Sequence, residues 1–212
     1  MSVEDNYSKV SSTINLLSTK TNLILVSKNQ SMSVISSLIK AGHKDFGENR
    51  VQEAVSKWSF ETLKNYQIKL HLIGKLQSNK AKDAFGIFDY IHTLDNEKLA
   101  QIFAKLENVS DKKIKYFVQV NVGNEPQKSG ISIDKVNQFI KYCMNDLKLN
   151  IIGLMCIPPA ENDPTRYFVS LAELARANNL KELSMGMSND YECAINNGAT
   201  FVRVGSKIFR SD

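Results

Sequence analysis

The first residue of this sequence that could do chemistry is Lys28, which closes the short apolar run Asn-Leu-Ile-Leu-Val-Ser-Lys at residues 22–28. Four consecutive apolar residues between Asn22 and Ser27 are typical of a strand that is buried on both faces in a parallel sheet. In parallel α/β folds ligands bind at the carboxyl ends of the strands, so we expect Lys28 to point into a site from the rim of the core. A neutral lysine amine in such a site can attack an aldehyde. The alternative is a lysine that leaves the core for solvent, as most lysines do.

Glycines and hydroxyl side chains accompany the last two predicted strands, where they could bind an anion. Ser188 is expected to begin a helix, and Gly205 and Ser206 follow the final strand. In a barrel, the loops after strands seven and eight commonly form a phosphate site from backbone N–H groups and a helix N-terminus. A lysine nucleophile on the first strand that faces such a site describes a pocket for pyridoxal 5′-phosphate (PLP). The alternative for each loop, taken alone, is an ordinary turn.

The elements that must position these residues alternate regularly along the chain. Predicted strands cover residues 22–28, 45–47, 68–73, 90–94, 115–122, 151–157, 182–185 and 200–204. Predicted helices cover residues 7–17, 79–85, 96–106, 134–146, 164–178 and 188–196. Two further helices could be capped by Ser33 and Asn49, and these would run to Gly42 and Trp58.

Eight strands separated by helices indicate the α/β class and a closed (β/α)8 TIM-type barrel, although a doubly wound open sheet would show the same local pattern. Barrels of this kind run to about 250 residues, so this one is compact. The helix at residues 7–17 precedes the first strand and could complete the outer ring. We find no linker rich in Pro, Gly or Ser and no repeat beyond the strand–helix period, so we expect residues 1–212 to form a single domain.

Composition narrows the class of protein. The chain has 212 residues, of which 42% are hydrophobic, and a chain of this size can bury roughly 70% of its unfolded surface. It has no uninterrupted apolar stretch of about 18 residues, and residues 1–20 are polar, so we expect neither a membrane span nor a secretory signal and a cytoplasmic protein. Three scattered cysteines (Cys143, Cys156 and Cys193) and only three histidines argue against a disulfide framework and a metal site.

The net charge of +5 raises the question of nucleic acid. Lys75, Lys80 and Lys82 cluster, but no aromatic residues are interleaved with them, and the other basic residues are dispersed among acids. A solvated, mildly basic surface therefore fits better than a nucleic-acid interface. An anionic small ligand would also suit this charge.

Several short motifs follow one another along the chain. They are LVSK (25–28), FGENRVQE (46–53), HLIGKLQSNK (71–80), QVN (119–121) with Glu125, KSG (128–130), GLM (153–155), LSMGMS (183–188) with Asp190, and RVGS (203–206). Together they resemble the pyridoxal phosphate homeostasis protein family, from about Leu23 to Phe209. The resemblance implies a barrel similar to the N-terminal domain of alanine racemase, that is, PLP fold type III without the C-terminal β-domain. It also implies PLP bound as an aldimine and no established catalytic turnover.

The resemblance implies a role for each of seven residues. They are Lys28 for the Schiff base with PLP, Ser188, Gly205 and Ser206 for the phosphate, Arg203 for the pyridine nitrogen, and Asn49 and Met155 for the ring. A guanidinium group keeps its proton, so the pyridine nitrogen opposite Arg203 would stay unprotonated. PLP in such a site would be a poor electron sink, and no residue is assigned a catalytic role.

His71 is the remaining candidate for chemistry, because a histidine can act as an acid or a base near neutral pH. It lies inside the predicted strand at residues 68–73. At such a position we expect a hydrogen-bonded core histidine, and a catalytic base is the alternative.

Two classes of function fit these observations. The first is a carrier or regulator in intracellular PLP homeostasis, which binds PLP, supplies it to PLP-dependent apoenzymes and so affects amino acid pools. The second is a PLP-dependent amino acid racemase or decarboxylase. The racemase plan needs a second acid/base from the C-terminal β-domain of a partner subunit, and this sequence ends soon after its last predicted strand. We therefore expect a monomer without efficient catalysis. A basic RNA-binding barrel is a third class, which a salt-titrated binding assay would test.

Overall fold

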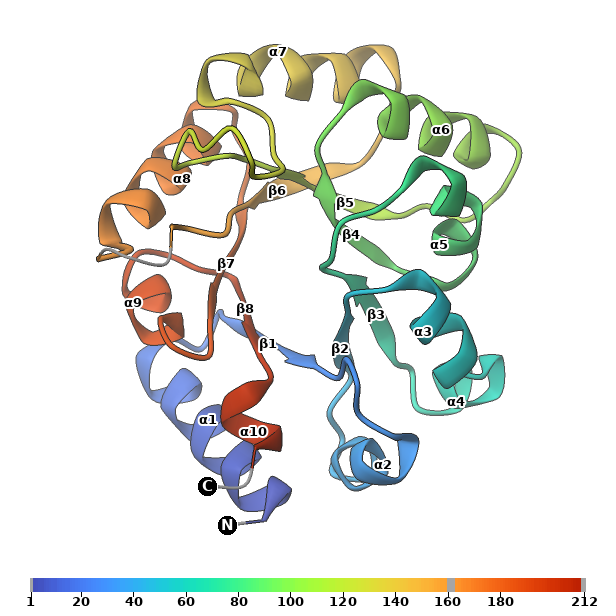
Figure 1. Cartoon of the computed structure of the whole chain (residues 1–212), viewed down its shortest axis with the longest axis vertical. Coiled ribbons are helices and arrows are strands. Elements are labelled where there is room, and N and C mark those ends of the chain that lie inside the picture. The colour runs from blue at the N-terminus through green and yellow to red at the C-terminus, as the bar shows by residue number, and fades with distance from the viewer. Residues whose placement is uncertain (1, 160–162, 211–212) are drawn as a thin grey trace.

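Eight parallel strands close into a barrel in the order in which they occur along the chain (Figure 1). They are β1 (Asn22–Val26), β2 (Asp45–Glu48), β3 (Lys69–Leu72), β4 (Tyr90–Leu94), β5 (Lys115–Gln119), β6 (Ile151–Met155), β7 (Glu182–Met187) and β8 (Phe201–Val204). The computed structural model describes residues 2–159 and 163–210, so the expected domain 1–212 also includes residues outside the described ranges. Because β8 pairs with β1, the barrel prediction is confirmed and the open sheet is excluded.

Helices surround this barrel (Figure 1). They are α1 (Val3–Leu17), α2 (Met32–Lys40), α3 (Val51–Lys57), α4 (Phe60–Asn65), α5 (Ala81–Ile87), α6 (Glu97–Asn108), α7 (Val136–Lys141), α8 (Thr165–Ala177), α9 (Tyr191–Asn196) and α10 (Ser206–Phe209). The helix predicted at 134–146 consists of α7 between a 3-10 turn, η2 (Ile133–Lys135), and a π-helical turn, η3 (Tyr142–Asp146). A further 3-10 turn, η1 (Ser78–Lys80), precedes α5. Helix α1 packs against α9 and α10 and so takes a place in the outer ring, as expected. Helices α4 and α10 were not predicted.

Two predicted N-caps near the start of the chain are wrong. Helix α2 begins after Ser31, whose hydroxyl lies 2.7 Å from that of Ser33. Helix α3 begins after Arg50 rather than after Asn49. The backbone carbonyl oxygen of Asn49 instead packs so closely against Gly74 that a Cβ atom on residue 74 would overlap with this oxygen. Asn49 is therefore fixed by the contact between two strand ends and not by a helix.

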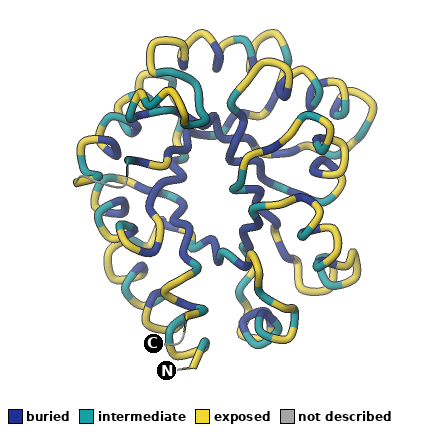
Figure 2. The backbone as a smooth tube through the Cα atoms, in the orientation of Figure 1, coloured by how far each residue is buried: buried dark blue, intermediate teal, exposed yellow. Residues whose placement is uncertain are grey.

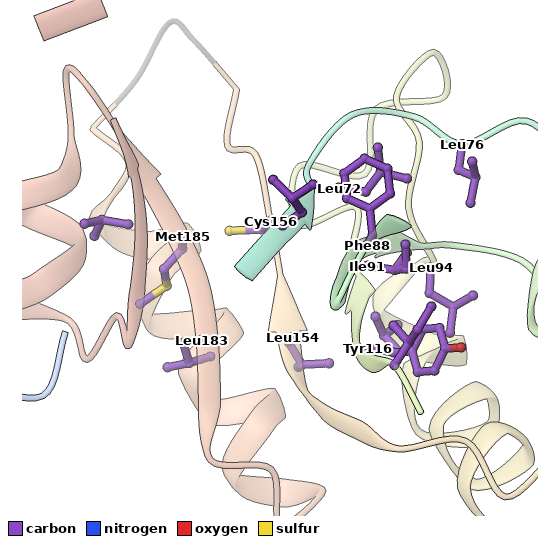
Figure 3. Close-up of a cluster of buried hydrophobic side chains, with 14 of the residues drawn as sticks. Leu72, Leu76, Phe88, Ile91, Leu94, Tyr116, Leu154, Cys156, Leu183 and Met185 are labelled. Atoms are coloured by element: carbon purple, nitrogen blue, oxygen red, sulfur yellow. The ribbon is translucent and has the colours of Figure 1, made fainter. Parts of the chain in front are cut away.

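Two apolar cores lie on the two sides of the sheet. Alternation separates them: on β4, Ile91 faces the helices and Tyr90 faces the barrel interior. The rings of Phe117 on β5 and Phe201 on β8 lie 5.5 Å apart although these strands are not neighbours, so they meet across the interior. Figure 2 shows the buried residues along the ring of strands, and Figure 3 shows part of the core between strands and helices. The inner core contains Ile24, Tyr90, Phe117, Met155 and Phe201.

The described part of the chain contains neither a membrane-spanning helix nor a cluster of metal-binding side chains. Among residues 2–159 and 163–210, no helix is long and apolar enough to cross a membrane. Nor do these residues contain a group of three or more His, Cys, Asp or Glu side chains that could hold a metal ion. The cysteines Cys143, Cys156 and Cys193 are free thiols.

Candidate functional site

A cavity of about 920 Å³ lies at the carboxyl ends of the strands. This volume is within the range of small-molecule sites. Six of the residues that the resemblance assigned to PLP line it: Lys28, Asn49, Ser188, Arg203, Gly205 and Ser206. The seventh, Met155, does not line the cavity but is fully buried in the inner core. The loop between β6 and α8 also lines the cavity, and its residues were not assigned to the site from the sequence. They are Ile157, Pro158, Pro159 and Pro164.

Lys28 lies in a turn two residues beyond the end of β1, not at the end of the strand itself. The chain turns there through Asn29, which has a left-handed φ of 59°. The side chain of Lys28 is exposed to the cavity and has no hydrogen-bond or ion-pair partner among residues 2–159 and 163–210. Its amine is thus available to a ligand without the loss of an existing bond.

A buried polar cluster holds the backbone directly before Lys28. The hydroxyl of Ser27 donates to Glu48 Oε1 at 2.7 Å, and Trp58 Nε1 donates to the same oxygen at 3.0 Å. Lys57 Nζ donates to the carbonyl oxygen of Ser27 at 2.7 Å and to Glu48 Oε1 at 3.0 Å. The side chains of Glu48 and Lys57 are 0% and 8% exposed. Because Ser27 is bound through both its side chain and its carbonyl group, the cluster fixes where the Lys28 turn begins.

Ser188 was predicted to begin the helix α9, and this prediction is wrong. Ser188 lies in the turn before that helix. Asp190 is the N-cap residue, and its Oδ1 accepts the backbone N–H of Met187 at 2.6 Å. The hydroxyl oxygen of Ser188 instead lies 3.4 Å from the backbone nitrogens of Gly205 and Lys207, at the start of α10. Ser188 therefore lies against the start of α10, a helix that the sequence did not predict.

Gly205 connects β8 to α10 at a point where the backbone passes close to β1. A Cβ atom at this position would lie 2.9 Å from the carbonyl oxygen of Val26, so only glycine fits without a shift of the backbone. The first N–H groups of a helix have no acceptor within the helix and favour an anion. Here the backbone N–H groups of Gly205 and Lys207 donate to the hydroxyl oxygen of Ser188, and with the hydroxyl groups of Ser188 and Ser206 they form a set of hydrogen-bond donors at this end of the cavity.

Arg203 projects from β8 into the barrel interior and is 4% exposed. Its Nη1 donates to Ser184 Oγ at 2.7 Å, and its Nη2 donates to the carbonyl oxygen of Cys156 at 2.9 Å. Burial lowers the pKa of Arg203 from its usual value, but a guanidinium group is not deprotonated in proteins. The same burial raises the pKa of the Cys156 thiol to about 12. The bottom of the cavity thus carries a fixed positive charge beside an inert thiol.

Cations outnumber carboxylates around the cavity. Lys28, Lys128, Arg203 and Arg210 line it, together with the carboxylate of Asp190. An excess of positive charge in a concave site attracts anionic small molecules. The charge of the site therefore agrees with the donor set at its Ser188 end.

The prediction of a hydrogen-bonded core histidine at position 71 is confirmed. His71 is fully buried, and its Nε2 lies 3.0 Å from Asp45 Oδ1. Its Nδ1 lies 3.0 Å from Nε2 of His92, which the sequence analysis did not single out. Neither ring lines the cavity, so neither is placed to act as a base on a ligand there.

The free energy of unfolding is expected to fall as the pH is lowered below about 6.5, the ordinary pKa of histidine. Burial lowers the pKa of His43, His71 and His92, which are the three histidines of the chain. Between these lowered pKa values and about 6.5 the unfolded chain binds more protons than the folded chain. The contribution of the histidines to the free energy of unfolding is therefore present above this pH window and is lost as the pH falls through it. The slope should reach about 1.4 kcal/mol per pH unit for each histidine, measured by urea unfolding at pH 7 and below. A slope that is the same in His92→Phe as in the wild type would contradict this assignment.

The site and fold define the class of protein. The sequence profile described as "Alanine racemase, N-terminal domain" matches residues 2–211. The solved structure of PipY from Synechococcus elongatus PCC7942 with PLP bound is similar, with a TM-score of 0.84 and 32% identity over 98% of this chain and 100% of that chain. Alanine racemase from Corynebacterium glutamicum shares the fold, with a TM-score of 0.73 and 13% identity over 98% of this chain and 61% of that chain. The chain is thus a barrel of the alanine racemase N-terminal type.

Curated relatives narrow this class further. The pyridoxal phosphate homeostasis protein of Aquifex aeolicus is 38% identical over 88% of this chain and 85% of its own length. That of Escherichia coli K12 is 35% identical over 88% of this chain and 84% of its own length. The chain belongs to the pyridoxal phosphate homeostasis protein family, and the resemblance found in its motifs is confirmed.

Proposed function

We propose that this chain binds PLP in the cavity at the carboxyl ends of the strands and acts in intracellular PLP homeostasis, as a carrier or regulator that affects amino acid pools. The observation that carries the proposal is the position of Lys28, which is exposed and has no partner among the described residues, in the same cavity as Ser188 and Gly205. Two further findings support it. Relatives that are 35% and 38% identical are named for PLP homeostasis, and PipY was solved with PLP bound.

The residues present fit the groups of PLP. The proposed assignments are Lys28 for the aldehyde carbon, Ser188, Gly205 and Ser206 for the phosphate, Arg203 for the pyridine nitrogen, Asn49 for the edge of the ring, and Met155 for support of the ring from the inner core. When bound, PLP supplies an electron-withdrawing ring that is joined covalently to a protein amine. The chain's own part is to hold the phosphate by hydrogen bonds, to present the amine of Lys28 to the aldehyde carbon, and to keep a proton on Arg203 next to the ring nitrogen.

The proposal is tested by titrating the purified chain with PLP. We expect an absorption band in the visible or near-ultraviolet that saturates with added PLP. Reduction with borohydride should then fix the cofactor to the chain, and peptide mass spectrometry should place it on Lys28. A chain that gives neither a saturable band nor a reduced adduct would contradict the proposed function.

Ser188→Ala is expected to weaken PLP binding roughly 10-fold or more. The substitution removes a hydroxyl group that would donate to a charged phosphate, and such a bond contributes about 1.5–3 kcal/mol. Affinities for PLP and for unphosphorylated pyridoxal should be measured side by side. Binding of pyridoxal should change much less, because it lacks the group that Ser188 would hold. Equal losses for both ligands would count against a phosphate at this end of the cavity.

We further propose that the chain is not an efficient enzyme on amino acids. Arg203 keeps its proton, so the ring nitrogen opposite it would stay unprotonated and would withdraw little charge from a carbanion at Cα. Hydrogen–deuterium exchange at Cα of L-alanine and other L-amino acids in D2O, followed by NMR and chiral analysis, measures this. We expect rates several orders of magnitude below the enzyme median of about 10 per second. Exchange near that median would instead favour a PLP-dependent racemase or decarboxylase.

The proposed setting of this function is the cytoplasm, with PLP-dependent apoenzymes as the recipients of the cofactor. We also propose that the chain acts as a monomer. Mass photometry or sedimentation of the PLP-loaded chain tests this part of the proposal.

A further inference from the structure

A continuous chain of hydrogen bonds runs through the barrel interior below the cavity. Arg203 Nη1 lies 2.7 Å from Ser184 Oγ, which in turn lies 2.8 Å from His92 Nδ1. His92 Nε2 lies 3.0 Å from His71 Nδ1, and His71 Nε2 lies 3.0 Å from Asp45 Oδ1. Asp45 is the first residue of β2, so the chain connects the cavity with the opposite end of the barrel.

The two charged ends of this chain fix the tautomers between them. A guanidinium group only donates hydrogen bonds, and an ionised carboxylate only accepts them. Burial alone would raise the pKa of Asp45, but the hydrogen bond from His71 and nearby positive charge lower it, so this carboxylate is ionised at neutral pH. His71 must therefore carry its proton on Nε2 and accept at Nδ1.

The tautomer of His71 fixes the hydrogen bonds between it and Arg203. His92 must carry its proton on Nε2, because it donates to His71, and its Nδ1 must accept the hydroxyl proton of Ser184. The oxygen of Ser184 is then left to accept from Arg203. Within this chain Ser184, His92 and His71 each donate once and accept once, so the bonds all run in one direction from the guanidinium to Asp45. Hydrogen bonds that are aligned in this way polarise one another in a low-dielectric interior.

Aromatic packing holds both imidazole rings in place. His71 stacks on Tyr90 with ring centroids 4.2 Å apart, and His92 stacks on Phe117 with centroids 4.3 Å apart. The ring of Phe201 also lies next to both histidines, with its centroid 5.9 Å from that of His71 and 6.1 Å from that of His92. The rings cannot rotate away from the hydrogen-bond chain without disturbing the inner core, so the chain is rigid.

Arg203 needs such support because it is a buried charge. Among residues 2–159 and 163–210 it forms no ion pair, and its direct partners are one hydroxyl oxygen and one carbonyl oxygen. A buried charge is costly unless it is hydrogen-bonded or compensated by an opposite charge. The carboxylate of Asp45 is connected to Arg203 through the aligned hydrogen bonds.

We propose that His92 and His71 are positioning residues, which hold the Arg203 guanidinium toward the cofactor's ring nitrogen and connect it to the carboxylate of Asp45 at the far end of the barrel. The placement of the ring nitrogen rests on the proposed function. The hydrogen-bond chain itself does not, since it is complete in the protein alone. The two histidines would act on the cofactor only through Ser184 and Arg203.

The first test uses the wild-type chain without PLP. Nitrogen-15 NMR of histidine-labelled protein at pH 7 should show His71 and His92 neutral and protonated on Nε2. An Nδ1-protonated or a charged ring at either position would overturn the proposal. This measurement of the tautomers does not require PLP, so its result is valid even if the proposed function is wrong.

The second test uses PLP labelled with nitrogen-15 in its ring. His92→Phe keeps the stacking on Phe117 but removes both hydrogen bonds of His92, so it should shift the ring-nitrogen resonance and weaken PLP binding roughly 10-fold. Ser184→Ala should have the same effects, and the double variant should add little, because both substitutions break one chain. His43→Phe is the control: it replaces a half-buried histidine that bonds the backbone carbonyl oxygen of Asp45 and not its carboxylate, so it should leave the resonance and the affinity as in the wild type.

A folded His92→Phe or Ser184→Ala chain with the wild-type resonance and affinity would overturn the proposal. So would equal effects in His43→Phe, because they would point to a general loss of core packing. Circular dichroism and urea unfolding establish that each variant is folded. If the wild-type chain binds no PLP at all, the proposed function fails, and the tautomers measured without PLP still decide whether the hydrogen-bond chain exists.

Discussion

Replacement of Lys28 by alanine is expected to abolish the covalent attachment of PLP. Lys28 is the cavity lysine whose amine has no partner among the described residues. Lys128 also lines the cavity, but its Nζ is bound to Glu125 Oε1 at 2.6 Å and to the carbonyl oxygen of Pro158 at 3.3 Å. Attack on an aldehyde requires an amine that is not held by other groups, which favours Lys28. The measurement is the amount of cofactor fixed by borohydride, which should fall from stoichiometric to background in Lys28→Ala.

Two variants serve as controls for this experiment. Lys28→Arg keeps the positive charge of the cavity but cannot form the same bond, so it should lose the adduct and retain part of the noncovalent affinity for PLP. Lys128→Ala removes a neighbouring cation and should keep the adduct. A stoichiometric adduct on another lysine in both Lys28 variants would show that the cofactor is attached elsewhere.

Lys57→Met is expected to destabilise the fold by about 3–5 kcal/mol, the usual effect of removing one partner from a buried ion pair. Glu48 is fully buried, and its Oε2 already has no hydrogen-bond partner among the described residues. Without Lys57, Glu48 Oε1 would keep only the neutral donors Ser27 and Trp58. Urea unfolding measures the change, and the fluorescence of Trp58, the only tryptophan of the chain, reports it from within the cluster.

The paired substitution Lys57→Met with Glu48→Gln should recover much of this loss, because it removes the fully buried charge and leaves only the partly exposed Glu53 without its ion pair to Lys57. Lys64→Met replaces an exposed lysine on α4 and should change the free energy of unfolding by less than about 0.5 kcal/mol. A loss of under about 1 kcal/mol in Lys57→Met would mean that the carboxylate of Glu48 is compensated by other means. PLP affinity should also fall in Lys57→Met, since Ser27 loses the donor that fixes its carbonyl group.

The eight strands could be predicted from the sequence because most of them are short, largely apolar runs that alternate with helices; β2, with the sequence Asp-Phe-Gly-Glu, is an exception. Once the barrel is assumed, parallel strands bring their carboxyl ends together, and this placed Lys28 and Arg203 at one site. Met155 shows the limit of this reasoning. Every residue of β6 is apolar or glycine, so no alternation in its sequence indicates which side chains face the interior.

The parts that could not be predicted depend on contacts between distant residues. Helix α10 has only four residues and no periodic pattern, so the helix itself had no sequence signal, although Gly205 and Ser206 at its start did. Ser184 and His92 lie 92 positions apart in the sequence and meet only because β4 and β7 both face the barrel interior. His92 taken alone resembles any polar residue in a strand. Its role follows from the ring of strands and not from its neighbours in the sequence.

The seam between β1 and β8 joins opposite ends of the sequence, as does the contact of α1 with α9 and α10 (Figure 1). During synthesis on the ribosome, β1 emerges early but has an unpaired edge until β8 has been made. Contacts of such large sequence separation slow folding. Lys28 lies on one side of the seam and Gly205 on the other, where their strands pass within contact distance at Val26. A newly made chain therefore gains its complete ligand site only when the ring closes, and capture of the cofactor becomes a measure of the final step of folding.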